Sequence, residues 1–176
     1  LSNEVSHFGV LEDQEKSAGI ALLGCKGGRV EANQVSDGNE RGIWLEGSEG
    51  ILVKGNDVFL IAGDKMKLRG YGIHLSGSDR NEIIANKVHK IEYIDILLAS
   101  SARNVVQDNH CGPAAADGIA LNGDGSVRNR ILSNRIESTQ WSQIYTSSGA
   151  HDNLFRDLHV TGGGWGASSN CAGGNR

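Results

Sequence analysis

The sequence predicts an all-β fold, a parallel β-helix of about six turns with three short strands in each turn. Three observations lead to this prediction. The 176 residues include 25 glycines, one proline and only 5% aromatic residues, which favours many short strands joined by tight turns. A unit of roughly 23 residues recurs along the chain. An asparagine stands at the same place in five of these units.

The recurring unit is visible in five segments that align with at most small shifts. They are "GIALLGCKGGRVEANQV" (19–35), "GIWLEGSEGILVKGNDV" (42–58), "GIHLSGSDRNEIIANKV" (72–88), "DILLASSARNVVQDNHC" (95–111) and "GIALNGDGSVRNRILSNRI" (118–136). A sixth segment, 143–160, is a degraded copy, and residues 3–5 are expected to be the tail of a further unit. The chain is therefore built from one structural unit used repeatedly.

The first strand of each unit is predicted by the pattern G-I-x-L. Its isoleucine and leucine are two residues apart, so both side chains point to the same face of a strand. The isoleucine recurs in steps of 23, 30, 23, 23 and 25 residues. Its copies are Ile20, Ile43, Ile73, Ile96, Ile119 and Ile144.

Two further groups of apolar residues in each unit predict a second and a third strand. The second-strand residues are Val30, Val53, Ile83, Val106 and Ile131. The third-strand residues are Val35, Val58, Val88, Cys111, Ile136 and Val160. If the units stack at ~4.8 Å, each strand pairs in parallel with its equivalent one unit on, and the apolar residues merge into one interior column. A leucine-rich horseshoe is not expected, because its L-x-x-L-x-L-x-x-N pattern is missing.

The repeated asparagine lies between the second and third strands, where the chain must bend sharply. Asparagine tolerates the left-handed backbone that such a bend requires. Stacked at ~4.8 Å, each side-chain amide can donate to the carbonyl of the next, so we expect an asparagine ladder. Its members are Asn33, Asn56, Asn86, Asn109 and Asn134.

The whole chain, residues 1–176, is expected to be one domain, with the repeat core at about 19–160. The glycine-rich segment 161–176 is expected to be a flexible end or a partial cap. Seventeen basic and 21 acidic side chains are interspersed and leave a net charge of −4, which disfavours a nucleic-acid partner. No apolar run approaches the ~20 residues of a membrane span, and no signal peptide is recognisable.

No cofactor or metal is expected. The three cysteines, Cys25, Cys111 and Cys171, are an odd number at no metal-like spacing, so at most one disulfide can form and no zinc site is indicated. The oxygen-rich segment "NGDGS" (122–126) has the composition of a calcium loop but not the spacing of a recognised calcium site.

The units, written G-I-x-L…N-x-I-x-x-N-x-V, resemble the right-handed parallel β-helix repeats of the pectin-lyase-like superfamily. The resemblance includes the repeat group found in carbohydrate-binding proteins and sugar hydrolases, and it covers about residues 19–160. It implies a single-stranded right-handed β-helix and a polysaccharide partner. It also implies a secreted, envelope or periplasmic location. The superfamily contains lyases, hydrolases, epimerases, adhesins and non-enzymatic proteins, so the fold alone does not assign the chemistry.

The resemblance implies that a polysaccharide lies along the outer face of the first strands. One outward row there reads Ala21, Trp44, His74, Leu97, Ala120 and Tyr145, and the next reads Leu23, Glu46, Ser76, Ala99, Asn122 and Ser147. Trp44 and Tyr145 are candidates for stacking on sugar rings, with packing under a neighbouring loop as the alternative. Glu46 and Asn122 are candidate polar contacts to the same substrate.

The third unit starts seven residues later than the usual step, after the insertion "FLIAGDKMKLRGYG". An acidic-polysaccharide lyase needs a cation to neutralise the uronate, a base and an acid. Arg69 or Lys67 as the cation, with His74 and Tyr71 as base and acid, would meet that need. The alternative is a solvated basic loop beside an ordinary surface histidine.

A glycoside hydrolase would instead use two carboxyl groups about 5 to 9 Å apart. Asp95 stands where most units have glycine, and Asp117 precedes the same strand one turn later, so these two residues are the candidate pair. The alignment predicts that Asp95 points outward. The alternative is that both carboxyl groups close turns by hydrogen bonding.

The leading hypothesis is a carbohydrate-active protein that binds a polysaccharide on the first-strand face, with lyase activity as its possible chemistry. The alternatives are a non-catalytic binding or structural module of a larger envelope, adhesin or tailspike protein, and the hydrolase. A metal-linked periplasmic accessory protein is a further class, but the six histidines fall on different rows. An uncovered end would favour association, so a homo-oligomer or attachment to a larger chain is also expected.

Overall fold

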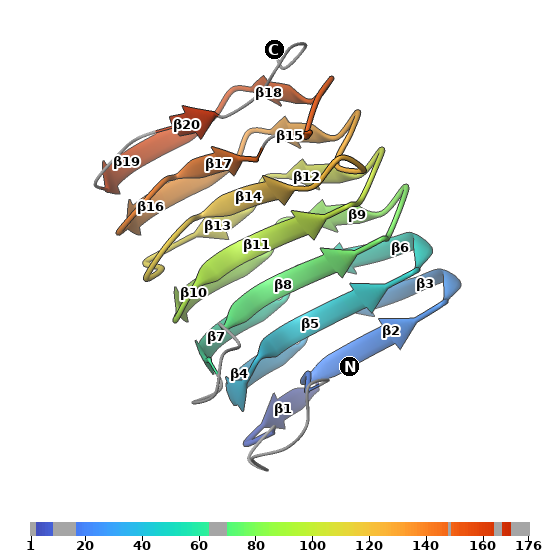
Figure 1. Cartoon of the computed structure of the whole chain (residues 1–176). Helices are drawn as coiled ribbons and strands as arrows, with labels where there is room; N and C mark the ends of the chain where they lie inside the picture. The colour runs from blue at the N-terminus through green and yellow to red at the C-terminus, as the bar shows by residue number, and fades with distance from the viewer. Residues whose placement is uncertain (1–2, 9–16, 64–69, 148, 164–166, 170–176) are drawn as a thin grey trace.

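A computed structural model describes residues 3–8, 17–63, 70–147, 149–163 and 167–169. This part of the chain forms twenty strands and no helix. The strands stack into three parallel sheets that run the length of a rod, with β1 and β2 at one end and β19 and β20 at the other (Figure 1). The fold is the predicted parallel β-helix, and its hand is right-handed, as for nearly all connections between parallel strands.

Each sheet collects one strand from successive turns. We call them the first-, second- and third-strand sheets, after the order of the strands in a turn. The first-strand sheet contains β2 (Ile20–Leu23), β5 (Arg41–Glu46), β8 (Tyr71–Ser76), β11 (Ile94–Ala99), β14 (Ile119–Asn122), β17 (Ile144–Thr146) and β20 (Ala167–Ser169). The second-strand sheet contains β3 (Lys26–Glu31), β6 (Glu49–Lys54), β9 (Glu82–Ile84), β12 (Val105–Gln107), β15 (Arg130–Leu132) and β18 (Leu154–Arg156). The third-strand sheet contains β1 (Glu4–Ser6), β4 (Gln34–Asn39), β7 (Asp57–Ala62), β10 (Lys87–Ile91), β13 (His110–Cys111), β16 (Arg135–Thr139) and β19 (His159–Gly163).

The register of the sheets is the one that the repeat predicts. Ile43 pairs with Ile73, and Ile73 pairs with Ile96 in the next turn. Val53 pairs with Ile83 in the second-strand sheet, and the same spacing holds in the third. The strands extend beyond the predicted repeat core, because β19 and β20 continue two of the sheets into the glycine-rich segment. Backbone ladder bonds do not need side chains, so glycine-rich segments can still pair as strands.

The interior of the rod is one apolar column. The isoleucines and leucines of the G-I-x-L pattern point inward and are fully buried from the second turn to the fifth, as Ile43, Leu45, Leu98 and Leu121 illustrate. Each buried side chain of this size stabilises the fold by about 1.5–3 kcal/mol. The column therefore supplies a continuous core to units that cannot bury their faces alone.

The predicted asparagine ladder is present at the bend between the second and third strands. The Nδ2 atom of Asn56 donates to Oδ1 of Asn86 at 2.9 Å, and Nδ2 of Asn86 donates to Oδ1 of Asn109 at 3.0 Å. Each amide also donates to a backbone carbonyl, as Asn109 does to Ile83 at 2.8 Å. A second ladder, which the sequence analysis did not identify, stabilises the bend between the first and second strands. Its members are Asn81, Asn104, Asn129 and Asn153.

Candidate functional site

The outward row of the first-strand sheet is aligned as predicted. Trp44 pairs with His74, His74 pairs with Leu97, and Ala120 pairs with Tyr145. The row is nevertheless mostly buried: Trp44 and His74 are only 5% and 9% exposed. Outward orientation on a strand therefore does not make these side chains accessible in this protein.

Arg41, at the start of β5, is the centre of a buried polar group on this face. Its NH1 atom lies 2.8 Å from a carboxylate oxygen of Glu40, and its Nε donates to Nδ1 of His74 at 3.1 Å. Its guanidinium carbon lies 4.5 Å from the centre of the Trp44 ring. The Trp44 ring is thus already stacked on a cation, and it is not the open sugar platform that the sequence suggested.

His74 is a neutral histidine at ordinary pH. Its burial, together with the nearby charge of Arg41, lowers its pKa to about 3. Because Nδ1 accepts a hydrogen bond from Arg41, the ring proton is on Nε2. His74 is therefore suited to donate a hydrogen bond from Nε2, and it is poorly suited to be the general base predicted from the sequence.

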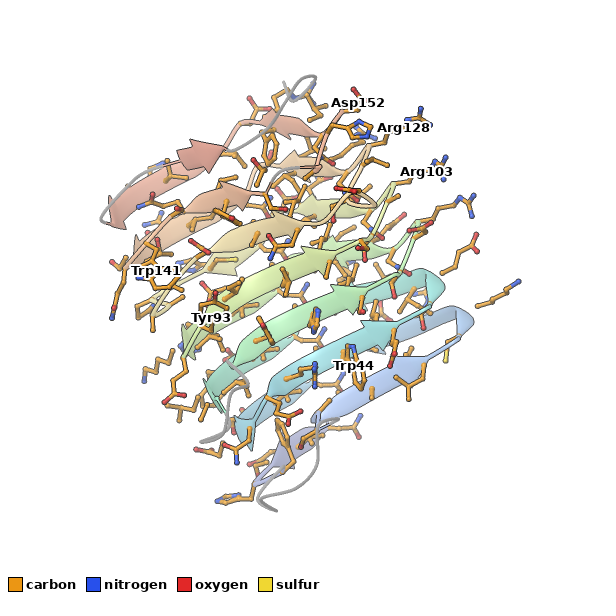
Figure 2. All side chains as sticks on the ribbon, viewed as in Figure 1. Trp44, Tyr93, Arg103, Arg128, Trp141 and Asp152 are labelled. Carbon is orange, nitrogen blue, oxygen red and sulfur yellow. The ribbon has the colours of Figure 1, made fainter. Side chains whose placement is uncertain are left out.

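An aromatic strip begins beside His74 and crosses the turns along the edge where the first strands start. We define the strip as Tyr71, Tyr93 and Trp141. Ring centres are 4.9 Å apart for Tyr71 and His74, 5.7 Å for Tyr71 and Tyr93, and 5.9 Å for Tyr93 and Trp141. Figure 2 shows Tyr93 and Trp141 near each other on this edge of the rod.

The strip is continuous because of a small residue between its last two members. The backbone NH of Ala116 donates to the Tyr93 carbonyl, and the NH of Trp141 donates to the Ala116 carbonyl, so the three residues occupy one position in successive turns. The alanine side chain leaves space in which the two aromatic rings meet edge to face. Trp141 is 49% exposed and forms the open end of the strip.

The other predicted substrate-binding residues lie nearby on the first-strand sheet. Tyr145 is half-buried and packs against a small apolar cluster that includes Leu97 and Ala120. Glu46 and Asn122 are half-exposed on the neighbouring outward row, towards the ends of their strands. These residues share one sheet with the strip, but they are not part of it.

Two residues of the proposed lyase group, Lys67 and Arg69, lie outside the described residues. The other two, Tyr71 and His74, are in ring contact. The cation found next to them is Arg41, which the sequence analysis did not single out. It comes from the preceding turn, where it pairs in register with Tyr71.

Asp95 does not point outward, and this corrects the prediction. It is completely buried, and neither carboxylate oxygen has a hydrogen-bond partner. Burial raises the pKa of Asp95 well above the ordinary value, and burial, followed by the Asp95 charge, also raises the pKa of the Cys111 thiol. The aligned glycines have no side chain, so they gave no indication of the direction that a side chain takes at this corner.

Asp117 has the structural role that was the alternative to catalysis. Its Oδ1 accepts a hydrogen bond from the backbone NH of Ser142 at 3.0 Å, and the residue is only 5% exposed. Burial raises its pKa despite that hydrogen bond. With Asp95 inside the rod and Asp117 closing a turn, the two carboxyl groups do not form an accessible hydrolytic pair.

Arg41, Tyr93 and Trp141 were not among the site residues predicted from the sequence. Only the spacing could have revealed them, since Tyr93 and Trp141 each stand just before a first strand, two turns apart. No group of three or more His, Cys, Asp or Glu residues that could hold a metal is found in the described ranges. Within the same ranges, no helix is long and apolar enough to cross a membrane.

Comparison with known proteins identifies relatives of the fold. Residues 13–157 match the family model described as "Periplasmic copper-binding protein (NosD)". The structure of the periplasmic alginate epimerase AlgG is similar, with 24% sequence identity and a TM-score of 0.67, over 80% of this chain and 31% of that one. A double mutant of the epimerase gives 23% identity and a TM-score of 0.73, over 89% of this chain and 36% of that one. No curated protein matches this chain.

These similarities concern the fold of only part of each epimerase structure. The chain spans about a third of the length of the similar epimerase structures. At this level of identity the structural likeness shows the fold alone, a right-handed parallel β-helix.

Proposed function

Because the chain belongs to the NosD family of β-helix proteins, we propose that it works outside the cytoplasm as a polysaccharide-binding β-helix. The sugar-binding surface in this proposal is the aromatic strip. The word periplasmic in both the family description and the name of the similar epimerase supports the location. That epimerase acts on alginate, which supports a polysaccharide as the ligand class.

The exposed Trp141 carries the proposal. Large apolar side chains that are exposed singly need no explanation, but Trp141 is the open end of a continuous line of rings. The face of a pyranose ring carries C–H groups that stack on aromatic rings, while its hydroxyl groups stay in water. An edge-to-face line of Tyr and Trp fits such a ligand because each residue is apolar with one polar end.

The closed end of the strip is the Tyr71 end, where the polar side chains of His74 and Arg41 lie. His74 accepts a hydrogen bond from Arg41, contacts the Tyr71 ring and is only 9% exposed, so its role in this proposal is to position Tyr71 and not to contact the sugar. Arg41 is held in place by Glu40 and Trp44 and does not have to be ordered when the ligand binds. Pre-ordered contacts of this kind lower the entropic cost of binding.

The test is a Trp141→Ala variant, assayed for binding to a panel of neutral and acidic polysaccharides by titration calorimetry. We expect about a ten-fold or larger loss of affinity, as for aromatic side chains that become buried when a ligand binds, and partial rescue by Trp141→Phe. Leu60→Ala is the matched control, because Leu60 is a similarly exposed apolar residue, 44%, on a different sheet. Binding that is unchanged in Trp141→Ala, or no binding of any polysaccharide to the native chain, would refute the proposal.

A second candidate is polysaccharide lyase activity at the closed end of the strip. The ring contact of Tyr71 and His74 next to Arg41 favours it, with Lys67 and Arg69 as further cations in the hypothesis. In that case the phenolate form of Tyr71, and not His74, would take the proton and become the phenol, since His74 is a very weak base. A lyase generates an unsaturated product that absorbs in the ultraviolet. Product that forms with the native chain and disappears in Tyr71→Phe would support it; no product from any uronate polymer would exclude it.

The family description names copper, and the described residues do not fit a copper site. Copper in proteins is bound by clustered His, Cys or Met side chains. Here His89 is bound to Asp57, His110 to Glu137, and His151 to Asp152, each on its own turn. We therefore assign no copper site to the described residues. Association with a second copy or with a larger chain remains part of the hypothesis, and light scattering of the isolated chain tests the first of these.

A further inference from the structure

A tetrapeptide, Ser-x-Arg-Asn, recurs in three successive turns at the bend between the first and second strands. Its copies are "SDRN" (78–81), "SARN" (101–104) and "SVRN" (126–129). We define the arginine column as Arg80, Arg103 and Arg128. The aromatic strip lies where the first strands begin, and the arginine column lies where they end, about 20 Å away for six-residue strands.

The serine and the asparagine of the tetrapeptide have a structural function. Both are buried, and they form hydrogen bonds from turn to turn. The backbone NH of Ser78 donates to Oγ of Ser101 at 3.0 Å, and the NH of Asn104 donates to Oδ1 of Asn129 at 2.9 Å. The bend that carries each arginine is therefore held on both sides.

The arginine itself is not required by the fold. All three side chains are exposed, and all three residues have left-handed backbones, with φ values of 55°, 58° and 58°. Glycine is the residue best suited to this conformation, and the two lower turns have Gly27 and Gly50 at this position. Other bends of the rod have left-handed alanines, such as Ala32 and Ala85, so a bend of this kind accepts several residue types and does not by itself select arginine.

The charges of the column are largely free to act on a ligand. Arg80 forms an ion pair with Glu49. Within the described part of the chain, Arg103 and Arg128 have no ion-pair partner, and neither has the exposed Arg130 at the start of β15. Figure 2 shows Arg103 and Arg128 projecting from the same edge of the rod, with Asp152 ending the row above them.

The spacing of the column is set by the stacking of the turns. The NH of Arg80 donates to the Ala102 carbonyl, and the NH of Arg103 donates to the Val127 carbonyl, each at 3.0 Å. The arginines therefore follow one another at ~4.8 Å along the rod axis. A hollow continues the line below Arg80, where the missing side chains of Gly28 and Gly50 leave space.

Acidic residues limit the positive surface to a narrow line. Asp79, Glu82, Asp124 and Asp152 flank the column. Of these, Asp79 accepts a hydrogen bond from the NH of Ala102, and Asp152 contacts His151. With a net charge of −4 on the whole chain, this surface does not suit a duplex nucleic acid or a membrane, which need broad basic faces.

We propose that the arginine column binds a single chain of an acidic polysaccharide, whose carboxylates lie along the rod axis and meet successive guanidinium groups. Arginine and carboxylate form paired, parallel hydrogen bonds, which suits a repeated carboxylate better than a neutral sugar. The proposal does not depend on the aromatic strip, because the two surfaces lie on opposite edges of the first-strand sheet.

The test compares galacturonate oligomers with a neutral glucan of equal length, by titration calorimetry at low and at high salt. The double variant Arg103→Gln/Arg128→Gln is expected to bind galacturonate roughly two- to thirty-fold more weakly at low salt, as for the loss of two exposed charge pairs. Binding by the native chain should weaken as salt is added. The matched control Arg135→Gln/Arg156→Gln removes the same charge from exposed arginines that are already paired with Glu137 and Asp157, and it should bind almost as the native chain does.

The result separates this proposal from the aromatic strip. If Trp141→Ala weakens only glucan binding and the arginine double variant weakens only galacturonate binding, both surfaces are supported. If no variant changes glucan binding but the arginine double variant loses galacturonate binding, the arginine column is supported as a binding site and the aromatic strip is refuted as one. Galacturonate affinity that is equal in the native chain and the double variant, or absent at low salt, overturns the column.

Discussion

Replacing Asp95 and Cys111 together, by Gly and Val, is expected to stabilise the protein. At the equivalent place one turn below, Gly72 faces Val88, and a Cβ on Gly72 would overlap the valine methyl and lie 2.6 Å from the Asp95 carbonyl oxygen. Val88 pairs in register with Cys111. The smaller thiol thus provides the space for the Asp95 side chain, and the double variant restores the pair found in the turn below.

The magnitude follows from the environment of the carboxyl group. Asp95 is 0% exposed, and its two oxygens have no hydrogen-bond partner. Removing such a group is worth about 1–3 kcal/mol, and the greater freedom of glycine in the unfolded chain offsets about 0.5–1 kcal/mol. The net gain of about 0.5–2 kcal/mol corresponds to a rise in Tm of roughly 1–8 °C for a chain of this size.

The gain should grow with pH. Burial raises the folded-state pKa of Asp95 well above the ordinary value of 3.8 that applies to the unfolded chain. The contribution of Asp95 to the stability of the native protein is therefore complete below about pH 3.8. The stability then decreases by up to about 1.4 kcal/mol per pH unit as the pH rises towards the folded-state pKa. The double variant does not have this titration, whereas all other groups titrate alike in both proteins.

The assay is urea unfolding of the native chain, both single variants and the double variant between about pH 4 and pH 8. Cys111→Val alone should destabilise by about 1–3 kcal/mol, because it crowds the Asp95 side chain. The reasoning is refuted if the difference between the double variant and the native protein is the same at every pH. It is also refuted if Cys111→Val alone is as stable as the native chain.

Three further predictions concern the buried His74 on the first-strand sheet, the asparagine ladder, and the glycine before a first strand. His74→Gln should make the stability less sensitive to acid. The pKa of His74 is about 3 in the folded chain and 6.5 in the unfolded chain, so the native protein loses stability as the pH falls below 6.5, by about 2 kcal/mol at pH 5. Urea unfolding midpoints of both proteins at neutral and acid pH measure this difference. Asn109→Ala should cost about 3–5 kcal/mol in urea unfolding, since it removes four buried hydrogen bonds, and the exposed neighbour variant Asp108→Asn should cost almost nothing. Equal losses would contradict the ladder. Gly42→Ala should lower the Tm more than Gly47→Ala, because its Cβ would lie 2.7 Å from a backbone oxygen, whereas Gly47 has open space and only a left-handed backbone.

The architecture was predictable because the forces that determine it are periodic. Ile43, Ile73 and Ile96 recur at the spacing of one turn, and parallel pairing converts that spacing directly into one column. Asn86 and Asn109 follow the same spacing and form the ladder. Each of these residues contacts the equivalent residue in the next turn, so the repeat in the sequence is enough to predict the contact.

The candidate site was only partly predictable. His74 and Tyr71 were singled out, but Arg41 was not, because the contact of Arg41 and His74 joins different positions of two turns separated by the insertion. Trp141 meets Tyr93 across two turns, through the space that Ala116 leaves. Lys67 and Arg69 lie outside the described residues, so their part of the lyase hypothesis is still a prediction.

By itself, the sequence determined the fold class, the register and the interior column, since like residues stack on like. Only the tertiary structure decided which outward side chains are accessible. Trp44 and His74 are covered by their neighbours, Trp141 is open, and Asp95 points into the core. The physical reason is that burial of a side chain depends on unlike residues from neighbouring turns that pack over it, and a repeat pattern contains no information about those contacts.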